Sequence, residues 1–178
     1  MARQQKSAER EKAVTPPVEL KKPLFDRVAG YLDSTDWHYD SVHDKNYFDL
    51  RARIRDTHVR VILDVFETEE WQRVLSLAIY PVFVPEARRQ ATLEAINRIN
   101  FQMIYGSFEM DMEDGQVRVR TIVEAERDLP DPMIERAMHS SIETSNRYFA
   151  PLMAVAFGSA DPAKVLDLVP RADSTTVQ

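Results

Sequence analysis

The sequence predicts an α+β fold in which a single antiparallel sheet of about five strands carries helices on one face. Apolar residues recur at every second position between residues 47 and 83 and again between 107 and 123, as they do in strands with one buried face. The segments 23–37, 85–106 and 131–158 repeat instead at three and four residues, which is typical of amphipathic helices. The predicted order is therefore α-β-β-β-α-β-β-α.

The first two helices each show a single apolar stripe. In the first, the stripe consists of Leu24, Phe25, Val28, Tyr31 and Leu32, and a proline precedes it at residue 23, where its missing N–H costs nothing. The buried stripe of the second is predicted as Leu93, Ile96, either Ile99 or Asn100, and Met103. Gly106 is placed where a helix cap with positive φ is needed.

The last helix has start and stop signals at both ends. Asp131 is predicted as its N-cap, Pro132 as its first residue and Gly158 as the residue past its end. Pro151 should kink or interrupt it, because proline removes a helical hydrogen bond. A short turn of helix is expected over residues 161–168.

The first three strands are separated by polar breaks at residues 56–57 and 68–70, which predict hairpins. Alternation places on the buried face of the first two strands Phe48, Leu50, Ala52, Ile54, Val59, Val61, Leu63 and Val65. In the third strand the same pattern is followed by Leu75, Leu77 and Ile79.

The stretch GSFEMDMEDGQVRVR, residues 106–120, has two interpretations. Its acids resemble part of a calcium loop, but they are out of register and the closing bidentate glutamate is absent. The dipeptide Asp114-Gly115 instead predicts a two-residue hairpin turn. Pairing outward from that turn puts Asp111 opposite Arg118 and Glu109 opposite Arg120, with residues 108, 110, 112, 117 and 119 on the core face. The hairpin explains the whole stretch, so we prefer it.

Composition sets the broad class. The 178 residues suffice for one domain, and a formal net charge of −6 argues against non-specific binding to nucleic acid or an anionic membrane. The chain has no cysteine, and it contains no apolar run long enough for a membrane span or a signal peptide. We expect a cytoplasmic protein with a disordered tail at 1–22, one domain at 23–168 and a flexible C-terminus at 169–178.

The sequence offers no set of reactive side chains. The histidines at 38, 43, 58 and 139 lack the spacing of a metal site, and neither a nucleophile elbow nor a glycine-rich phosphate loop is present. We predict no catalytic, cofactor-binding or metal-binding residues and hence no enzyme. A hydrolase or metal enzyme stays open only if His38 or His43 converges with acidic side chains.

The outward face of the predicted sheet combines arginine with apolar side chains, a composition enriched in the cores of protein interfaces. Alternation also places Ala78 there. The residues predicted for a partner or dimer surface are Arg51, Arg53, Arg60, Ile62, Phe66, Tyr80, Arg120 and Ile122. The alternative is an ordinary solvated face laced with ion pairs.

The stretch EAINRINFQMIYGSFEMDMEDGQVRVRTIV, with Asn97 and Asn100 in its helix and a glycine that leads into a strand, resembles the YbjN family of bacterial sensory transduction regulators. The stretch LDVFETEEWQRVLSLAIYPVFVPEARR fits the middle strands of the same family, and the resemblance covers roughly residues 24–158. That family is similar in fold to the dimeric chaperones of type III secretion, which bind extended segments of partner proteins. The resemblance implies a small dimeric regulator and supplies no catalytic residues.

These observations predict a non-enzymatic protein-binding regulator or chaperone-like adaptor in bacterial signalling or stress response. It is expected to act as a homodimer and to bind a further protein that the sequence does not identify. No cofactor is expected. The alternative is a sensor that binds a small anionic ligand on the arginine-bearing face.

Overall fold

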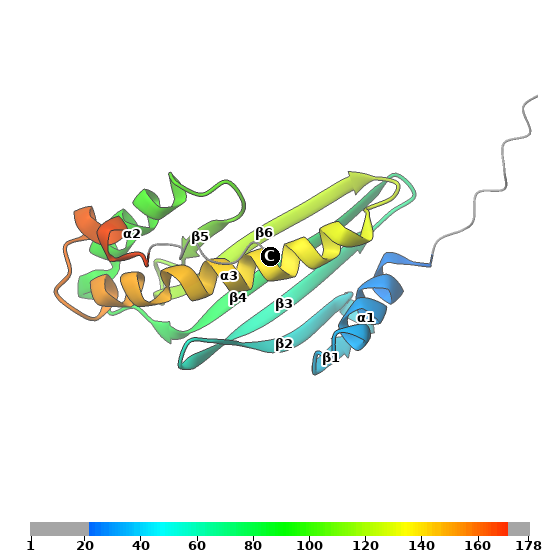
Figure 1. Ribbon diagram of the computed structural model, residues 1–178, viewed down its shortest axis with the longest axis horizontal. Helices are drawn as coiled ribbons and strands as arrows, with labels where there is room; N and C mark the ends of the chain where they lie inside the picture. Colours follow the sequence, from blue (N-terminus) through cyan, green and yellow to red (C-terminus); the bar gives the residue numbers. More distant parts are fainter. Residues whose placement is uncertain (1–21, 171–178) are drawn as a thin grey trace, which may run out of the picture.

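Six antiparallel strands form one sheet, and the long helix α3 (Asp131–Ala156) crosses it on one face (Figure 1). The computed structural model describes residues 22–170, so the predictions for the remaining terminal residues lie outside it. The sheet order is β1 (Tyr39–Val42), β2 (Tyr47–Ile54), β3 (Thr57–Glu67), β4 (Trp71–Phe83), β6 (Gln116–Glu126) and β5 (Ser107–Met110). The predicted α+β class is confirmed, and the short strand β1 makes six strands where about five were expected.

Helix α1 (Leu24–Ser34) buries Leu24, Val28 and Leu32 of the predicted stripe and leaves its other two residues half-buried. Helix α2 (Glu86–Asn100) buries Ile96 and Ile99, but Leu93 of its predicted stripe is exposed. Gly106 has a positive φ of 70°, as expected, but it lies in the loop before β5 and caps no helix. The side chain of Asn100 explains the earlier end of α2. It accepts a hydrogen bond from the Phe108 N–H at 2.8 Å and donates one to the Phe108 carbonyl at 3.0 Å, which ties the end of the helix to β5. Two 3-10 helices, η1 (His43–Lys45) and η2 (Pro162–Leu168), complete the fold, and η2 matches the predicted turn.

Helix α3 begins at Asp131, one residue before the predicted first residue Pro132, and its cap is not the predicted one. Pro130 is the N-cap, and the carboxylate of Asp131 bonds to Arg27 of α1 instead of to its own helix. The helix also continues through Pro151 to Ala156, so no interruption occurs there. Pro151 is buried.

The face of the sheet beneath α1 and α3 forms the core. All eight residues predicted for this face of β2 and β3 are buried, at 5 % exposure or less. Aromatic contacts connect the layers: the Phe25 ring of α1 stacks on Phe48 of β2 at 4.3 Å between centroids.

The prediction for β4 is wrong by one position. Ser76, Ala78 and Tyr80 face the helices, while Leu75, Leu77 and Ile79 face away from them. Ser76 and Ala78 are small where α3 passes close to β4: the hydroxyl oxygens of Ser76 and Ser141 are 2.7 Å apart. The Tyr80 hydroxyl donates a hydrogen bond to the Ser145 carbonyl at 3.1 Å.

The hairpin of β5 and β6 is present, with a register different from the predicted one. Met110 pairs with Val117 and Glu109 with Arg118, and the connection occupies residues 111–115. A longer loop is required because Gly115, with φ at 82°, packs against the end of β4. A Cβ there would come within 2.2 Å of the Val84 carbonyl oxygen.

Candidate functional site

One face of the sheet has no helix over it. Outward-pointing side chains of β2, β3, β4 and β6 alternate with the buried ones, and we call this surface the open face. It includes Tyr47, Asp49, Arg51, Arg53, His58, Arg60, Ile62, Asp64, Phe66, Trp71, Arg73, Leu75, Leu77, Ile79, Arg118, Arg120, Ile122, Glu124 and Glu126.

The centre of the open face is apolar. Strand register places Ile62 opposite Leu77, and in the next row Leu75 opposite Ile122. Ile79 extends this strip along β4. The side chains on β3 and β4 are half-buried by their neighbours, and Ile122 is 44 % exposed. A continuous aliphatic strip across three strands is more than the scattered apolar residues that an ordinary surface carries.

The open face carries positive charge at one end of the strands and negative charge at the other. At the β2–β3 hairpin, the basic end has Arg51, Arg53, Arg60 and Arg118, with His58 beside them. Two carboxylates contact this group. Asp49 accepts from Arg60, with Nη2 to Oδ2 at 2.6 Å, and Glu109 accepts from Arg118 at 2.8 Å. The contact with Asp49 raises the pKa of Arg60. Glu109 also accepts from Arg120, at 2.7 Å, so five arginines against two carboxylates leave an excess of three positive charges.

The other end of the open face, next to the β3–β4 hairpin, is acidic and aromatic. This acidic end has Asp64, Glu124 and Glu126 around a single arginine, Arg73, with Phe66 and Trp71 beside them. Arg73 lies 3.6 Å from Asp64 and places its guanidinium 5.0 Å from the centre of the Phe66 ring. Three carboxylates against one arginine leave an excess of two negative charges.

Two arginines of the basic end have no carboxylate partner among residues 22–170. Arg51 is directly opposite Arg60 in the register of β2 and β3, so two like charges face each other. Arg53 makes one long hydrogen bond, from Nε to the Arg55 carbonyl at 3.4 Å. Arg51 also lines, with Arg60, a surface hollow of about 830 Å³ beside β1.

Seven of the eight residues predicted for a partner or dimer surface lie on the open face. The exception is Tyr80, which is 1 % exposed and points into the core, because the phase of β4 is reversed. For the same reason, Leu75, Leu77 and Ile79 were predicted for the buried face, although they lie on the open face. Arg73 could have revealed the correct phase of β4. It lies on the same side of the strand as these three residues, so placing them in the core would also have buried its charge without a partner.

Four of the residues considered for metal or acid–base chemistry make other contacts, while His38 lines the surface hollow beside β1 together with Asp40 and Asp49. His139 Nε2 lies 2.9 Å from the Tyr31 hydroxyl, and the His43 ring packs 4.6 Å from Phe25. Asp111 and Asp114 accept backbone N–H bonds within their own loop at 2.8 and 2.7 Å. Within residues 22–170 no three His, Asp or Glu side chains come together as a metal site would require.

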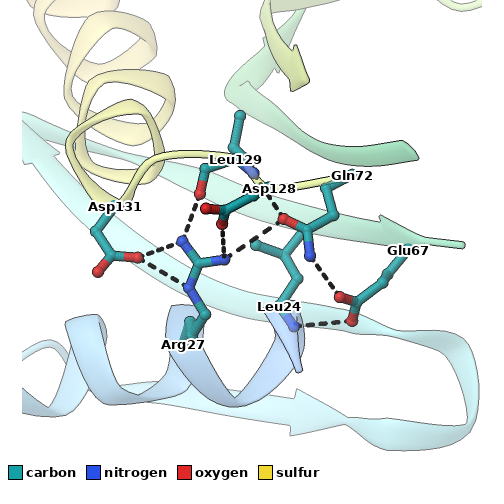
Figure 2. Close-up of polar contacts among 7 residues, drawn as sticks. All are labelled: Leu24, Arg27, Glu67, Gln72, Asp128, Leu129 and Asp131. Atoms are coloured by element: carbon teal, nitrogen blue, oxygen red, sulfur yellow. Dashed lines mark hydrogen bonds and ion pairs between the residues drawn. The ribbon is translucent and has the colours of Figure 1, made fainter. Parts of the chain in front are cut away.

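The densest polar network ties α1 to the rest of the fold (Figure 2). Arg27 of α1, whose side chain is 8 % exposed, donates to the Asp131 carboxylate and the Leu129 carbonyl and lies 3.4 Å from Asp128. Gln72 of β4 continues the network by accepting from the Leu129 N–H at 2.7 Å. The geometry is that of a clamp that holds α1 against the β6–α3 connection.

A second branch of the network fixes the start of α1. Gln72 donates to Glu67 at 2.5 Å, and Glu67 in turn accepts the free N–H of Leu24 at 2.8 Å. This bond satisfies one of the backbone donors that a helix N-terminus leaves open. The whole cluster therefore secures the helical layer and leaves the open face uncovered.

The fold and surface together define a class: a small α+β domain whose helices cover one side of the sheet and whose other side displays a sorted, partly apolar face. Residues 24–153 match the model of the YbjN family, described as "Putative bacterial sensory transduction regulator". This match spans well over half of the chain, and the protein belongs to the YbjN family. A search for relatives among curated proteins gave no significant match. No helix within residues 22–170 is both long and apolar enough to span a membrane.

Proposed function

We propose that this protein is a non-enzymatic regulator or chaperone-like adaptor that acts by binding protein at its open face, in the bacterial cytoplasm and as a homodimer. The observation that carries the proposal is the aliphatic strip of Ile62, Leu75, Leu77 and Ile122 between two charged ends. Burying such a strip supplies affinity, and the charged ends supply orientation. Family membership supports a regulatory role.

The composition of the open face favours contact with a protein over contact with bulk water. Apolar side chains occupy its middle, and arginines and aromatic rings, which dominate interface energetics, surround them. The inward face of the same strands already supplies the core, so the outward aliphatic residues are not needed to hold the fold together.

Photo-crosslinking in the living bacterium tests this proposal. A photoreactive amino acid replaces Ile122 on the open face, and the control places it at Lys164, an exposed position on η2. We expect a protein adduct at position 122, either with another copy or with a different protein, and none at 164. Absence of an adduct at 122, or equal adducts at both positions, contradicts the proposal.

A second candidate is a sensor for a small anionic ligand, favoured by the hollow beside Arg51 and Arg60. A ligand there would meet the Arg51 guanidinium, which has no carboxylate partner among residues 22–170, and two aspartates, Asp40 and Asp49, also line the hollow. A thermal-shift screen of anionic metabolites tests it, and the double replacement of Arg51 and Arg60 by Ala should abolish any stabilisation. A panel that raises the Tm of neither form removes this candidate.

A further inference from the structure

We propose that the edge of β2 at Arg51 and Arg53 binds an extended acidic segment of another protein, which joins the sheet as an additional antiparallel strand. The inference goes beyond the proposed function, because this contact is made by the backbone of β2 and does not depend on what covers the aliphatic strip. It follows from the unpaired backbone groups of this edge, from the protection of the opposite edge and from the unpaired arginines.

Strand β1 lies along only one part of the outer edge of β2 (Figure 1). Its four residues pair with residues 47–50 of β2. Residues 51–54 have β3 on one side and no strand of the described chain on the other. The second part of β2 is therefore an edge strand, with room for a further strand beside it.

The backbone groups of Arg51 and Arg53 point to this free side. In an antiparallel pair, residues that bond to the neighbouring strand alternate with residues that point away from it. The Val65 N–H donates to the Asn46 carbonyl at 2.8 Å, which assigns the even-numbered residues of β2 to β3. The N–H and C=O groups of Arg51 and Arg53 thus point outwards, and they have no hydrogen-bond partner among residues 22–170.

The opposite edge of the sheet is protected at the corresponding groups. On β5, the Asn100 side chain bonds to both the N–H and the C=O of Phe108. Beyond β5, the edge of β6 carries Glu124 and Glu126, which repel an acidic segment. Among the sheet edges of the described residues, only the second part of β2 combines free backbone groups with positive side chains.

The side chains beside the free groups determine the charge of the segment. Arg51 and Arg53 are exposed, lie on the open face and have no carboxylate partner among residues 22–170. They belong to the basic end, which has an excess of three positive charges. In an antiparallel pair, two residues of the segment that are two positions apart lie directly opposite them on the same face. Two acidic residues at that spacing therefore pair with both guanidinium groups.

The surroundings of the edge fit such a segment. Ala52, between the two arginines, is buried on the covered face, so the residue between the two acids points to that side and should be apolar. The hollow of about 830 Å³ adjoins Arg51 at the end of β1. It gives the segment space to leave the edge on the open side of the sheet.

Fluorescence anisotropy with a synthetic peptide and the full chain tests the inference. The peptide is a fluorescein-labelled hexamer in which glutamate and valine alternate. A second peptide has lysine in place of glutamate. Two further peptides keep the glutamates and carry backbone N-methyl groups, either on the glutamates or on the valines. In the proposed pairing only the glutamate N–H groups bond to β2, because they lie opposite Arg51 and Arg53.

We expect the glutamate peptide and its valine-methylated form to bind with similar affinity. The lysine peptide and the glutamate-methylated form should bind at least about tenfold more weakly. The double variant Arg51→Glu and Arg53→Glu should prefer the lysine peptide. Urea unfolding checks that this variant keeps its fold. The control pair Arg98→Glu and Lys164→Glu makes the same change in net charge away from β2 and should leave binding unchanged.

Three results overturn the inference. The first is a Kd for the glutamate peptide weaker than about 1 mM. The second is equal binding of the glutamate and lysine peptides. The third is equal binding of the two methylated peptides, because attraction of charge without strand pairing does not distinguish them. None of these results removes the proposed function, which crosslinking at position 122 of β6 tests separately.

Discussion

The strands of this protein present two faces that differ in kind. On the covered face, position after position is filled by a buried aliphatic or aromatic side chain, and α1 and α3 lie over them (Figure 1). On the open face, arginines and carboxylates surround an aliphatic strip that nothing in residues 22–170 covers. One set of strands thus has two different faces. The covered face forms the core, and the open face is the surface that we propose for recognition.

Replacing Phe48 by Ala is expected to have the largest effect on stability. Phe48 is fully buried on the covered face and stacks on Phe25, so the change removes a large apolar contact and leaves a cavity. We expect a loss of about 4 kcal/mol in the free energy of unfolding, measured by urea denaturation. A loss below about 1 kcal/mol would show that the covered face is not the main core.

Removing the clamp around Arg27 is expected to have the second largest effect on the free energy of unfolding. Arg27→Ala removes several hydrogen bonds to charged and backbone groups and should cost about 2 kcal/mol in the free energy of unfolding. Arg98→Ala is a matched control, because Arg98 forms an exposed i,i+4 pair with Glu94. It should cost no more than about 0.5 kcal/mol. Equal losses in the two variants would mean that the clamp does not hold α1.

Replacing Tyr80 by Phe is expected to have a smaller effect on stability, and one that depends on pH. Tyr80→Phe removes the hydrogen bond to the Ser145 carbonyl and should cost about 1 kcal/mol at neutral pH. Burial raises the pKa of the Tyr80 phenol, so the folded state holds its proton more tightly than the unfolded chain. Stability should therefore fall as the pH rises above about 10, and less steeply in the variant.

The alkaline fall should be reduced in that variant and still present. Burial raises the pKa of Tyr31, and a hydrogen bond to Asp33 raises that of Tyr39, so both contribute to it. Urea titrations between pH 7 and 11 make the measurement, with Tyr105→Phe as the control for loss of an exposed phenol. An identical fall in the Tyr80→Phe variant and the wild-type chain would contradict the buried position of Tyr80.

Ile122→Ser on the open face is expected to have the smallest effect on stability and a clear effect on binding. Ile122 is 44 % exposed and borders the aliphatic strip, so the free energy of unfolding should change by no more than about 0.5 kcal/mol. Self-association, measured by sedimentation, should weaken by about tenfold. A stability loss comparable to that of Phe48→Ala would remove the distinction between the two faces.

The sequence predicted the architecture well where one face of an element is clearly apolar. Strands β2 and β3 alternate strictly, so their buried residues were all identified. The prediction for strand β4 was wrong because both of its alternating sets of side chains are largely apolar. The local pattern does not show which of the two sets a helix covers. The close approach of α3, seen in the contact between Ser76 and Ser141, decides it, and that is a tertiary effect.

The predictions for the hairpin of β5 and β6 and for the start of α3 were wrong for a related reason. A dipeptide such as Asp114-Gly115 favours a tight turn locally, but packing of Gly115 against the Val84 backbone sets the actual loop. Asp131 is a good cap residue, yet Arg27 of another helix takes its carboxylate. In both places a contact between distant segments outweighs the local preference.

The candidate site was predictable in composition and not in arrangement. Alternation identified the arginines of β2, together with Ile62, Phe66 and Ile122. The sorting of charge into a basic and an acidic end depends on the register of four strands and on their order in the sheet. Neither follows from one sequence, because β4 and β6 are neighbours although α2 and β5 separate them along the chain.

The most direct test of the distinction between the two faces is methyl NMR of the isoleucine side chains over a series of protein concentrations. Signals from Ile62, Ile79 and Ile122 on the open face should shift together as the chain associates. Signals from the buried Ile54 and Ile134 should stay in place. Concentration-dependent shifts confined to residues outside the open face would contradict the account.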